Sequence, residues 1–267
     1  MKAKKLKVGT FMGQTLKVRS LSGFTLSKTG HDQYMKVPKH EHEYPYISLS
    51  LAGIYHEKSI VSEYHIKSGN SIFRPKGFEH KNEIGAQHSL CFNIEIEKEL
   101  ADHKHYSKTP NSVQFERNNL EILKIFYGFQ CDFSDELLAL SLEENLYHLL
   151  NQQHFEKRLG RAPWIGKIKK EIRLQPDRTY RIEDVANALH LHPNYFVRKF
   201  KEKTGFTFGE YLLRQRIAMG IDLMLHSSKS LTEIAMDCGF YDQSHFIRHF
   251  KHFFGTTPFH YRQVVKG

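Results

Sequence analysis

Two segments near the C-terminus repeat each other at an offset of 49 to 50 residues, and this repeat constrains the fold more than any other feature. Each copy begins with apolar residues at positions i, i+3, i+4 and i+7, a spacing that places them on one face of a helix. These positions are Ile182, Val185, Ala186 and Leu189 in the first copy, and Leu231, Ile234, Ala235 and Cys238 in the second. A repeat of this kind predicts a supersecondary unit that occurs twice.

Each copy continues with a short turn and a second helical segment. Phe196 and Phe200 are four residues apart in the first copy, and Phe246 and Phe250 are four apart in the second. The phenylalanines predict the buried stripe of the second helix. Two short helices joined by a turn of three or four residues make a helix-turn-helix unit. We therefore expect two such units after residue 161.

Residues at the ends of the second helices support these boundaries. Pro193 suits the first helical position, where a missing N–H has no consequence. Asp242 is a good N-cap for the second copy, whereas His192 is a poor one for the first. Gly205 and Gly255 are placed to end the two helices.

A single helix is expected to join the two units. Thr207 to Glu210 and Ser230 to Glu233 both fit the capping box. The helix between them, from about Phe208 to His226, would span roughly 27 Å at ~1.5 Å per residue. That length is close to the ~34 Å between successive major-groove faces of one DNA duplex.

Charge is distributed unevenly along the chain. Residues 161–267 carry 18 basic and 10 acidic side chains, a net charge of +8, whereas residues 1–160 carry 21 and 19, a net charge of +2. A basic segment beside a nearly neutral one suggests that one part binds a polyanion. Lysine and arginine also solvate ordinary helical surfaces, and charge alone does not distinguish DNA, RNA and an anionic membrane.

The second helices have outward positions that suit base recognition. Arginine pairs with guanine, asparagine or glutamine pairs with adenine, and an aliphatic group contacts the thymine methyl. Lys201 and Lys251 lie deeper in the helices and are expected to contact phosphates, unless they are ordinary solvated charges. The candidate DNA-binding residues are Asn194, Val197, Arg198, Lys201, Gln243, Ser244, Ile247, Arg248 and Lys251.

Residues 165 to 262 closely resemble the DNA-binding domain of AraC/XylS-family bacterial transcription regulators. The resemblance is most specific in the runs 239–251 and 255–262, GFYDQSHFIRHFK and GTTPFHYR. The first unit departs from the pattern, because His192 replaces a Ser-like cap and Thr207-Phe208 lacks the proline of the second copy. The resemblance implies double-stranded DNA as a partner, a sensor domain, homodimerisation and, for an activator, RNA polymerase.

The first part of the chain reads as a β domain. Apolar and polar residues alternate in 47–51, near 61–66 and in 90–96, and glycine and proline stand between these runs. From about Phe115 to Phe155 the period becomes helical. The expected fold is multidomain α and β: a cupin-like β domain at 1–110, a helical connector at 111–160, and an all-α DNA-binding domain at 161–267. The linker is expected at Gly160 to Pro163.

The tract HEHEY at 40–44 and the run from Gly69 to His80 look like a cupin barrel, a sensor domain of many AraC-family members, over roughly residues 25 to 100. His-x-His on a strand points both imidazoles to one face, and a third from His80 would complete a site for Fe, Mn, Ni or Zn. However, Tyr46 and Ile47 stand where a carboxylate ligand is expected, and Glu43 points to the opposite face. We therefore expect no metal and no cofactor; if a metal binds, its ligands are His40, His42 and His80.

The blander interpretation treats these side chains as polar groups that hydrogen-bond a small-molecule effector. Arg74 either pairs with an anionic group on that ligand or is a surface charge on a strand. The candidate effector-binding residues are His40, His42, Tyr46, Arg74 and His80.

The leucine-rich connector is predicted to form a dimer interface, with packing against the barrel as the alternative, and Trp164 is predicted to anchor the DNA-binding domain. Cys91, Cys131 and Cys238 are odd in number and widely spread, so they form no disulfide framework and no metal clip. No run of 18 apolar residues predicts a membrane span, and no signal peptide is recognisable. A reduced cytoplasmic protein that does not bind membranes is expected.

Together these features predict an effector-responsive, sequence-specific transcription regulator that is not an enzyme. The sequence does not distinguish an activator from a repressor. Two alternatives stay open. One is a metal-dependent cupin enzyme fused to a DNA-binding domain. The other is a regulator that responds to stress or to a protein partner and has an empty or collapsed barrel.

Overall fold

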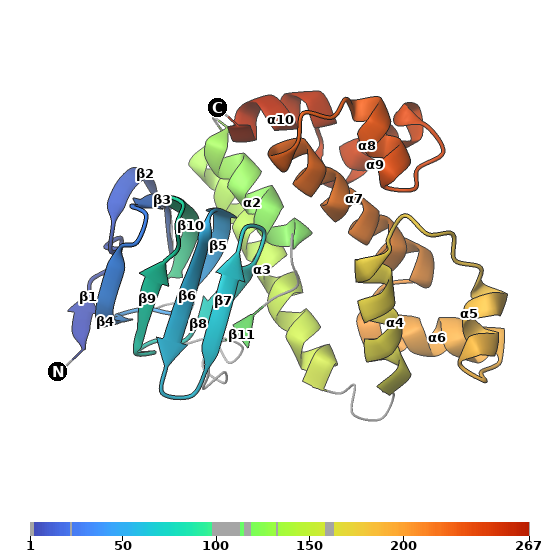
Figure 1. Ribbon diagram of the computed structural model, residues 1–267, viewed down its shortest axis with the longest axis horizontal. Coiled ribbons are helices and arrows are strands. Elements are labelled where there is room, and N and C mark those ends of the chain that lie inside the picture. Colours follow the sequence, from blue (N-terminus) through green and yellow to red (C-terminus); the bar gives the residue numbers. More distant parts are fainter. Residues whose placement is uncertain are drawn as a thin grey trace. The chain divides into compact units, whose positions relative to one another are not determined.

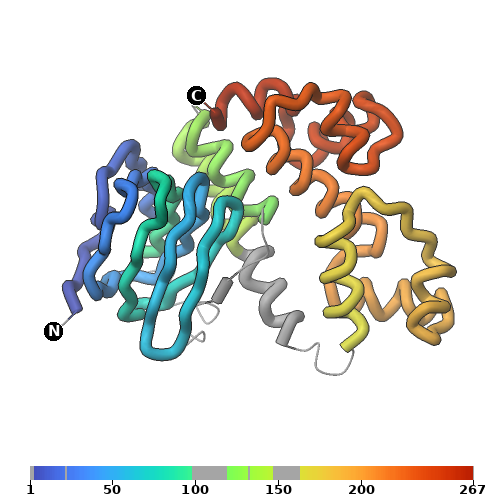
Figure 2. The backbone as a smooth tube through the Cα atoms, viewed as in Figure 1, coloured from blue at the N-terminus to red at the C-terminus, as the bar shows by residue number. Residues whose placement is uncertain are grey.

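The computed structural model describes residues 3–21, 23–97, 113–114, 119–131, 133–157 and 163–266. The chain divides into two compact units, Met1–Glu144 and Asn145–Gly267, shown as ribbons in Figure 1 and as a tube in Figure 2. The predicted boundaries after residues 110 and 160 stay predictions, and residues 160–162 of the predicted linker lie outside the described residues. No helix in the described part is long and apolar enough to cross a membrane.

The first unit is rich in β-strands, as expected. The strands are β1 (Lys4–Leu6), β2 (Gln14–Leu21), β3 (Phe24–His31), β4 (Lys36–His42), β5 (Tyr46–Ala52), β6 (Ile54–Ser59), β7 (Glu63–Lys67), β8 (Ser71–Arg74), β9 (His80–Ile84), β10 (Ser89–Ile96) and β11 (Val113–Gln114). The strands predicted at 47–51 and 90–96 are confirmed, and the strand predicted near 61–66 is confirmed from Glu63 onward. Val61 lies in a turn instead, because the hydroxyl of Ser59 accepts hydrogen bonds from the backbone N–H groups of Val61 and Ser62.

The described strands form two sheets rather than one closed barrel, which corrects the barrel expectation. One sheet has the order β1-β4-β9-β6-β7 and the other the order β11-β8-β5-β10-β3-β2. No described edge strand of one sheet pairs with a strand of the other sheet. The β domain itself is as predicted, but the described strands form two separate sheets instead of a continuous barrel wall.

Strand β10 shows how the second sheet is sided. Phe92 packs against Phe126 and Phe129 of helix α2 (Leu120–Gln130), with ring centroids 5.1 Å apart in both cases. Cys91 and Asn93, on the alternate face, line a cavity between the two sheets. Helix α2 therefore covers one face of the sheet and leaves the other face to the cavity.

Helices α2 and α3 (Asp135–Lys157) confirm the helical period predicted from 115 to 155. Leu138, Leu142 and Leu146 are fully buried in α3, whereas Leu137 and Leu140 are 61% and 63% exposed. The side chains of the later leucines, 149 and 150, lie outside the described residues. One face of α3 packs in the fold, and another presents leucine to solvent.

The second unit is helical, and its two helix-turn-helix units are confirmed. Its helices are α4 (Pro163–Leu174), α5 (Ile182–Ala188), α6 (Pro193–Thr204), α7 (Phe208–His226), α8 (Leu231–Asp237), α9 (Gln243–Phe254) and α10 (Pro258–Lys266). The joining helix α7 has the predicted bounds. The capping boxes at Thr207 and Ser230 are both formed, and Gly205 and Gly255 end α6 and α9 in the left-handed conformation.

The first recognition helix corrects one expectation. His192 caps α6, because its Nδ1 accepts a hydrogen bond of 3.3 Å from the backbone N–H of Asn194. An imidazole whose Nδ1 is unprotonated is an acceptor, which the sequence-based view of histidine as a poor cap overlooked. Asp242 caps α9 as predicted, accepting a bond of 2.7 Å from the N–H of His245.

The core of the second unit is built on the repeated phenylalanines. Phe196, Phe200, Phe246 and Phe250 are all fully buried, as predicted. Trp164 packs on Phe196 with ring centroids 5.4 Å apart, so its predicted anchoring role is confirmed. These contacts fix which face of α6 and α9 points outward.

Candidate functional sites

The outward faces of α6 and α9 carry the residues predicted to contact DNA. Six of the nine are exposed, and the other three are partly exposed. The exposed set is Asn194, Arg198, Lys201, Ser244, Arg248 and Lys251, and the partly exposed set is Val197, Gln243 and Ile247. Their roles on DNA stay predictions, but all nine side chains reach solvent opposite the phenylalanine stripe.

Two other arginines of this unit have a structural task. Arg216 of α7 donates from Nε to the carbonyl oxygen of Pro176 at 2.9 Å, in the loop before α5. Arg262 of α10 donates to the carbonyl oxygens of Lys229 and Ser227 at 2.9 and 2.7 Å, in the loop before α8. Each helix-turn-helix unit thus has an arginine that donates hydrogen bonds to the loop before its first helix.

The recognition-helix arginines differ from these two. Within the described part of the chain, neither Arg198 nor Arg248 forms an ion pair with a carboxylate, and both are exposed. Arg198 lies beside the ring of Tyr195, 6.0 Å from its centroid. Both guanidinium groups therefore remain available to a polyanion.

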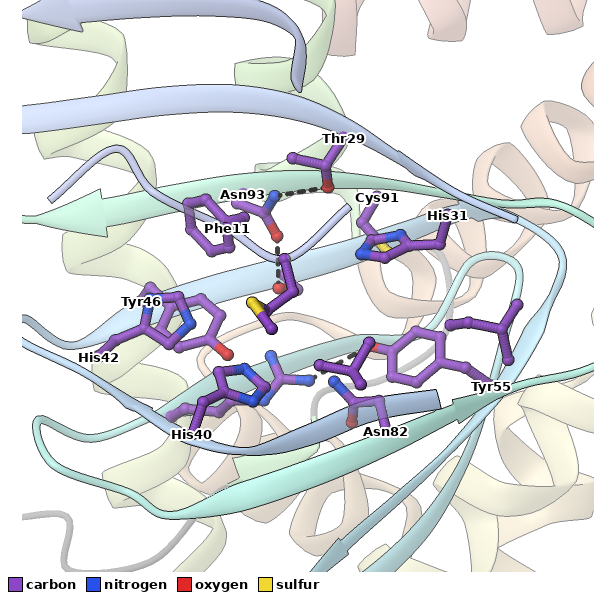
Figure 3. Close-up of a pocket in the computed structure, with 15 residues that line it drawn as sticks. Phe11, Thr29, His31, His40, His42, Tyr46, Tyr55, Asn82, Cys91 and Asn93 are labelled. Carbon is purple, nitrogen blue, oxygen red and sulfur yellow. Dashed lines mark hydrogen bonds between the residues drawn. The ribbon is translucent and has the colours of Figure 1, made fainter. Parts of the chain in front are cut away.

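The cavity of the first unit lies between the two sheets (Figure 3). It measures about 410 Å³ with its solvent-open mouth included. Strands β4, β6 and β9 line it from one sheet, and β3, β5, β8 and β10 line it from the other. Its walls are formed by Phe11, Met12, Thr29, His31, Val37, His40, His42, Tyr46, Ser48, Tyr55, Arg74, Asn82, Ile84, Cys91 and Asn93.

Three buried imidazoles meet at one end of the cavity. One ring nitrogen each from His40, His42 and His80 could bind a metal, and these three atoms lie within 4.8 Å of one another. The Nδ1 atoms of His40 and His80 each lie 2.9 Å from a backbone carbonyl oxygen two residues earlier, Pro38 and Phe78. A carbonyl oxygen accepts, so these Nδ1 atoms carry the proton and each Nε2 keeps its lone pair.

Burial keeps these histidines neutral. It lowers the pKa of His40 to about 4 and that of His42 to about 3, and it lowers the pKa of His80 well below the usual value. The nearby guanidinium of Arg74 lowers all three further. At neutral pH the three rings therefore offer lone pairs and N–H groups without charge.

An ion pair joins the two sheets beside the histidines. Arg74 of β8 donates from Nε and Nη2 to Oε2 of Glu57 of β6, at 2.9 and 2.5 Å, and from Nη2 to the hydroxyl of Tyr55 at 3.2 Å. Arg74 is 2% exposed and Glu57 is fully buried. The interpretation of Arg74 as a surface charge is therefore wrong. The Arg74 Nη1 atom has no hydrogen-bond partner among the described residues.

A second carboxylate approaches from β10. Glu95 is buried, and burial raises its pKa to about 7. Its Oε2 accepts a hydrogen bond from the backbone N–H of Gly9, and its Oε1 lies 3.6 Å from Nδ1 of His42. The ring of Phe11, two residues after Gly9, packs on His42 with centroids 4.8 Å apart. The segment before β2 is thereby held over the histidine end of the cavity.

The donor set fits a metal only in part. Zinc with bonds of ~2.0–2.1 Å needs ligand nitrogens about 3.3 Å apart, so the rings would have to move inward. Tyr46 already holds Nε2 of His80 through its hydroxyl at 3.0 Å. Glu57 Oε2 lies 4.0 Å from the same Nε2 but is bound to Arg74. Three neutral imidazoles suit a transition metal. Of the two described carboxylates beside them, Glu57 is bound to Arg74, whereas Oε1 of Glu95 has no hydrogen-bond partner among the described residues and lies 3.6 Å from Nδ1 of His42.

Comparison with known proteins addresses the helical unit most directly. Residues 185–263 match the family described as a helix-turn-helix domain. The chain is 36% identical over 111 residues to the regulatory protein PocR of Salmonella typhimurium, a match that covers 40% of this chain and 36% of PocR. Residues 185–263 form an AraC-type helix-turn-helix domain. The AraC/XylS resemblance seen in the sequence is thereby confirmed.

Two further matches extend beyond the AraC-type domain. The probable transcriptional regulator LumQ of Photobacterium leiognathi is 24% identical over 239 residues, which cover 85% of this chain and 92% of LumQ. The structure of ToxT from Vibrio cholerae aligns with 92% of this chain and all of ToxT, at 17% identity and a TM-score of 0.39. By contrast, the chain spans about a third of the length of PocR.

Sequence reasoning placed the predicted effector residues in one neighbourhood but missed several partners. His40, His42, Tyr46 and Arg74 line the cavity, and His80 contacts Tyr46 there. The carboxylates of Glu57 and Glu95 were missed, since each contacts its partner, Arg74 or His42, from another strand. Phe11 was missed because nothing in its local pattern marks a cavity wall; it lies in the loop before β2, which the hydrogen bond from Gly9 to Glu95 holds over His42.

Proposed function

We propose that this chain is a sequence-specific DNA-binding transcription regulator of the AraC type that responds to a small effector in its β domain. The observation that carries the proposal is the pair of helix-turn-helix units, each with an exposed arginine, Arg198 or Arg248, opposite its buried phenylalanines. Arginine in this position pairs with guanine in the major groove, and Lys201 and Lys251 add phosphate contacts.

The cavity supports an uncharged effector with hydroxyl groups. The charges of Arg74 and Glu57 cancel, the three histidines are neutral, and Glu95 titrates near pH 7. A buried anion would therefore meet no uncompensated positive charge among the described groups of the cavity. Groups that have no hydrogen-bond partner among the described residues include both nitrogens of His42, Nδ1 of His31 and Nη1 of Arg74. This mixture of donors and acceptors matches hydroxyl groups, which both donate and accept.

The proposed mechanism is linkage between effector binding and DNA binding. An effector that binds one arrangement of the protein better than another shifts the population toward that arrangement. The affinity for DNA then changes by the same factor by which DNA changes the affinity for the effector.

Two partners and a location belong to the same proposal. The exposed Leu137 and Leu140 of α3 support a homodimer interface in the connector. An activator of transcription would also contact RNA polymerase. Regulation of a bacterial gene takes place where the DNA is, so the protein would act in the cytoplasm.

The test is selection of bound fragments from a genomic DNA library by the full chain, with and without fractionated cell metabolites. The proposal predicts enrichment of a small set of related duplex sites, and a metabolite fraction of neutral polyols that changes the enrichment. An Arg74→Gln variant should keep the DNA sites and lose the metabolite response, if it retains its fold. Recovery of fragments without any shared sequence would contradict the proposal.

The alternative of a metal-dependent enzyme joined to a DNA-binding domain is favoured by one observation, the grouping of His40, His42 and His80. These residues would hold the ion through imidazole nitrogens, and the metal would supply Lewis-acid chemistry. Elemental analysis of protein purified without chelator tests this alternative. One bound transition metal per chain, absent from a His42→Ala variant, would support it, and a metal content near zero would exclude a resident ion.

A further inference from the structure

The second helix-turn-helix unit contains a side-chain bond that neither helix cap requires. The hydroxyl of Thr232 in α8 donates to Oε1 of Gln243 at 2.7 Å. The cap of α8 is formed by Ser230 and Glu233, and that of α9 by Asp242. The bond therefore joins the two helices of the unit in addition to their caps.

Gln243 occupies the position from which a recognition helix reads bases. It is the first residue of α9, and the N-terminal residues of a recognition helix contact base edges in the major groove. Its side chain is partly exposed, and Thr232 is exposed. The bond therefore lies at the solvent-facing entry of the recognition helix and does not belong to the core.

We propose that Thr232 is a positioning residue that fixes the amide of Gln243 for reading one adenine. This proposal rests on the proposed DNA-binding function. With Oε1 held by the threonine hydroxyl, the amide keeps a second lone pair on Oε1 and two N–H groups on Nε2. Adenine presents an N6–H donor beside an N7 acceptor, which pair with that oxygen and that nitrogen.

The same fixed amide disfavours guanine. Guanine presents two acceptors, O6 and N7, in the major groove. To satisfy both, the amide oxygen would have to turn away from the base, and the Thr232 hydroxyl opposes that rotation as long as it donates to Oε1. A freely rotating glutamine lacks this restraint and also loses more side-chain entropy when it binds.

The first unit lacks the device. The residues equivalent to Thr232 and Gln243 by the repeat offset are Glu183 and Pro193. Proline has no side-chain hydrogen-bonding group, so the first position of α6 reads no base in this way. The inference thus assigns an adenine preference to the half-site of the second unit alone.

The experiment is selection from randomised duplex DNA with the full chain in five forms: wild type, Thr232→Val, Thr232→Ser, Gln243→Ala and the Thr232→Val/Gln243→Ala double variant. Valine keeps the shape of threonine and removes the hydroxyl, whereas serine keeps the hydroxyl. The inference predicts that the wild type and Thr232→Ser select adenine at one position. Thr232→Val should lose most of that preference and bind the selected site more weakly, on the order of 3- to 10-fold.

Two readouts separate positioning from a structural role. Thr232→Val should unfold at the wild-type temperature and keep the wild-type salt dependence of binding, because phosphate contacts are unchanged. In the Gln243→Ala background, Thr232→Val should have no further effect on affinity. Selection of the wild-type base profile by Thr232→Val, or additive effects of the two substitutions, would overturn the inference. Failure of the wild type to select any sequence would instead overturn the proposed function.

Discussion

The two units of this chain use the same residue types in opposite ways. Arginine is exposed at Arg198 and Arg248 and has no carboxylate partner there among the described residues, but it is buried and paired at Arg74. Histidine caps a helix at His192 in solvent, but His42 is 2% exposed between two sheets. An exposed cation attracts an approaching anion, and salt screens this attraction. The charge of a buried group instead changes with pH and with a ligand that displaces water from around it.

This contrast predicts its largest effect at the buried ion pair. Glu57→Gln should destabilise the first unit by about 3–5 kcal/mol, because it leaves the Arg74 charge buried without a partner. Pulsed labelling of the buried Cys91 thiol along a urea series measures unfolding of this unit within the full chain. Fluorescence of Trp164, the single tryptophan, monitors the second unit, which should not change.

The matched control is an ion pair at the surface of the same unit. Lys39 and Glu79 form a pair in which both side chains are more than a third exposed. Glu79→Gln should therefore change stability by no more than about 1 kcal/mol. If Glu57→Gln and Glu79→Gln had equal effects, the contrast between buried and exposed charge would be contradicted.

The second effect is the response of the two units to acid. The folded pKa values of His40 and His42, about 4 and 3, lie below the unfolded value of 6.5. The unfolded chain then binds more protons, so stability is lost as pH falls below 6.5, at about 1.4 kcal/mol per pH unit for each histidine. Glu95, whose pKa is raised to about 7, has the opposite sign and offsets one histidine between pH 7 and 4.5.

The net expectation is a first unit that loses about 2 kcal/mol between pH 6.5 and pH 5, at about 1.4 kcal/mol per pH unit for the one histidine that Glu95 does not offset. Urea midpoints from Cys91 labelling at the two pH values test this. A His40→Gln/His42→Gln variant that folds should show a smaller loss. An equal acid response of Cys91 labelling and Trp164 fluorescence would contradict the assignment to the buried histidines.

The smallest effect lies within the second unit, between the two helix caps. Asp242→Ala should destabilise the unit by about 1 kcal/mol, because the cap bond and a favourable charge at the helix N-terminus are both lost. His192→Ala removes a longer bond from an uncharged cap and should cost about half of that. Trp164 fluorescence along a urea series measures both variants. A larger loss in His192→Ala would reverse the ranking of the caps.

The helical unit could be predicted closely because its signals are local. Apolar spacing, two capping boxes and the glycines at 205 and 255 each act within a few residues, and the bounds of α7 followed from them. The one cap misjudged was His192, since its capping ability depends on which imidazole nitrogen carries the proton.

The β unit was predicted less well because strand pairing joins distant residues. The histidines and Tyr46 could be grouped from their local pattern, but Glu57 reaches Arg74 only through the packing of β6 against β8. The strands before residue 30 were missed as well. The burial of Arg74 results from that packing, and no sequence pattern in the segment around Arg74 indicates it.

The proposed role of Arg198 and Arg248 is to read bases on one duplex. Its most direct test is binding of the full chain to its selected site and to single-base variants of that site, with Arg198→Lys and Arg248→Lys as the comparison. Lysine keeps the charge but not the bidentate fork. The account predicts that each variant keeps the salt dependence of the wild type and loses about 1–3 kcal/mol of discrimination at one guanine, in separate half-sites about one helical turn apart. Unchanged discrimination at every base pair in both variants would contradict it.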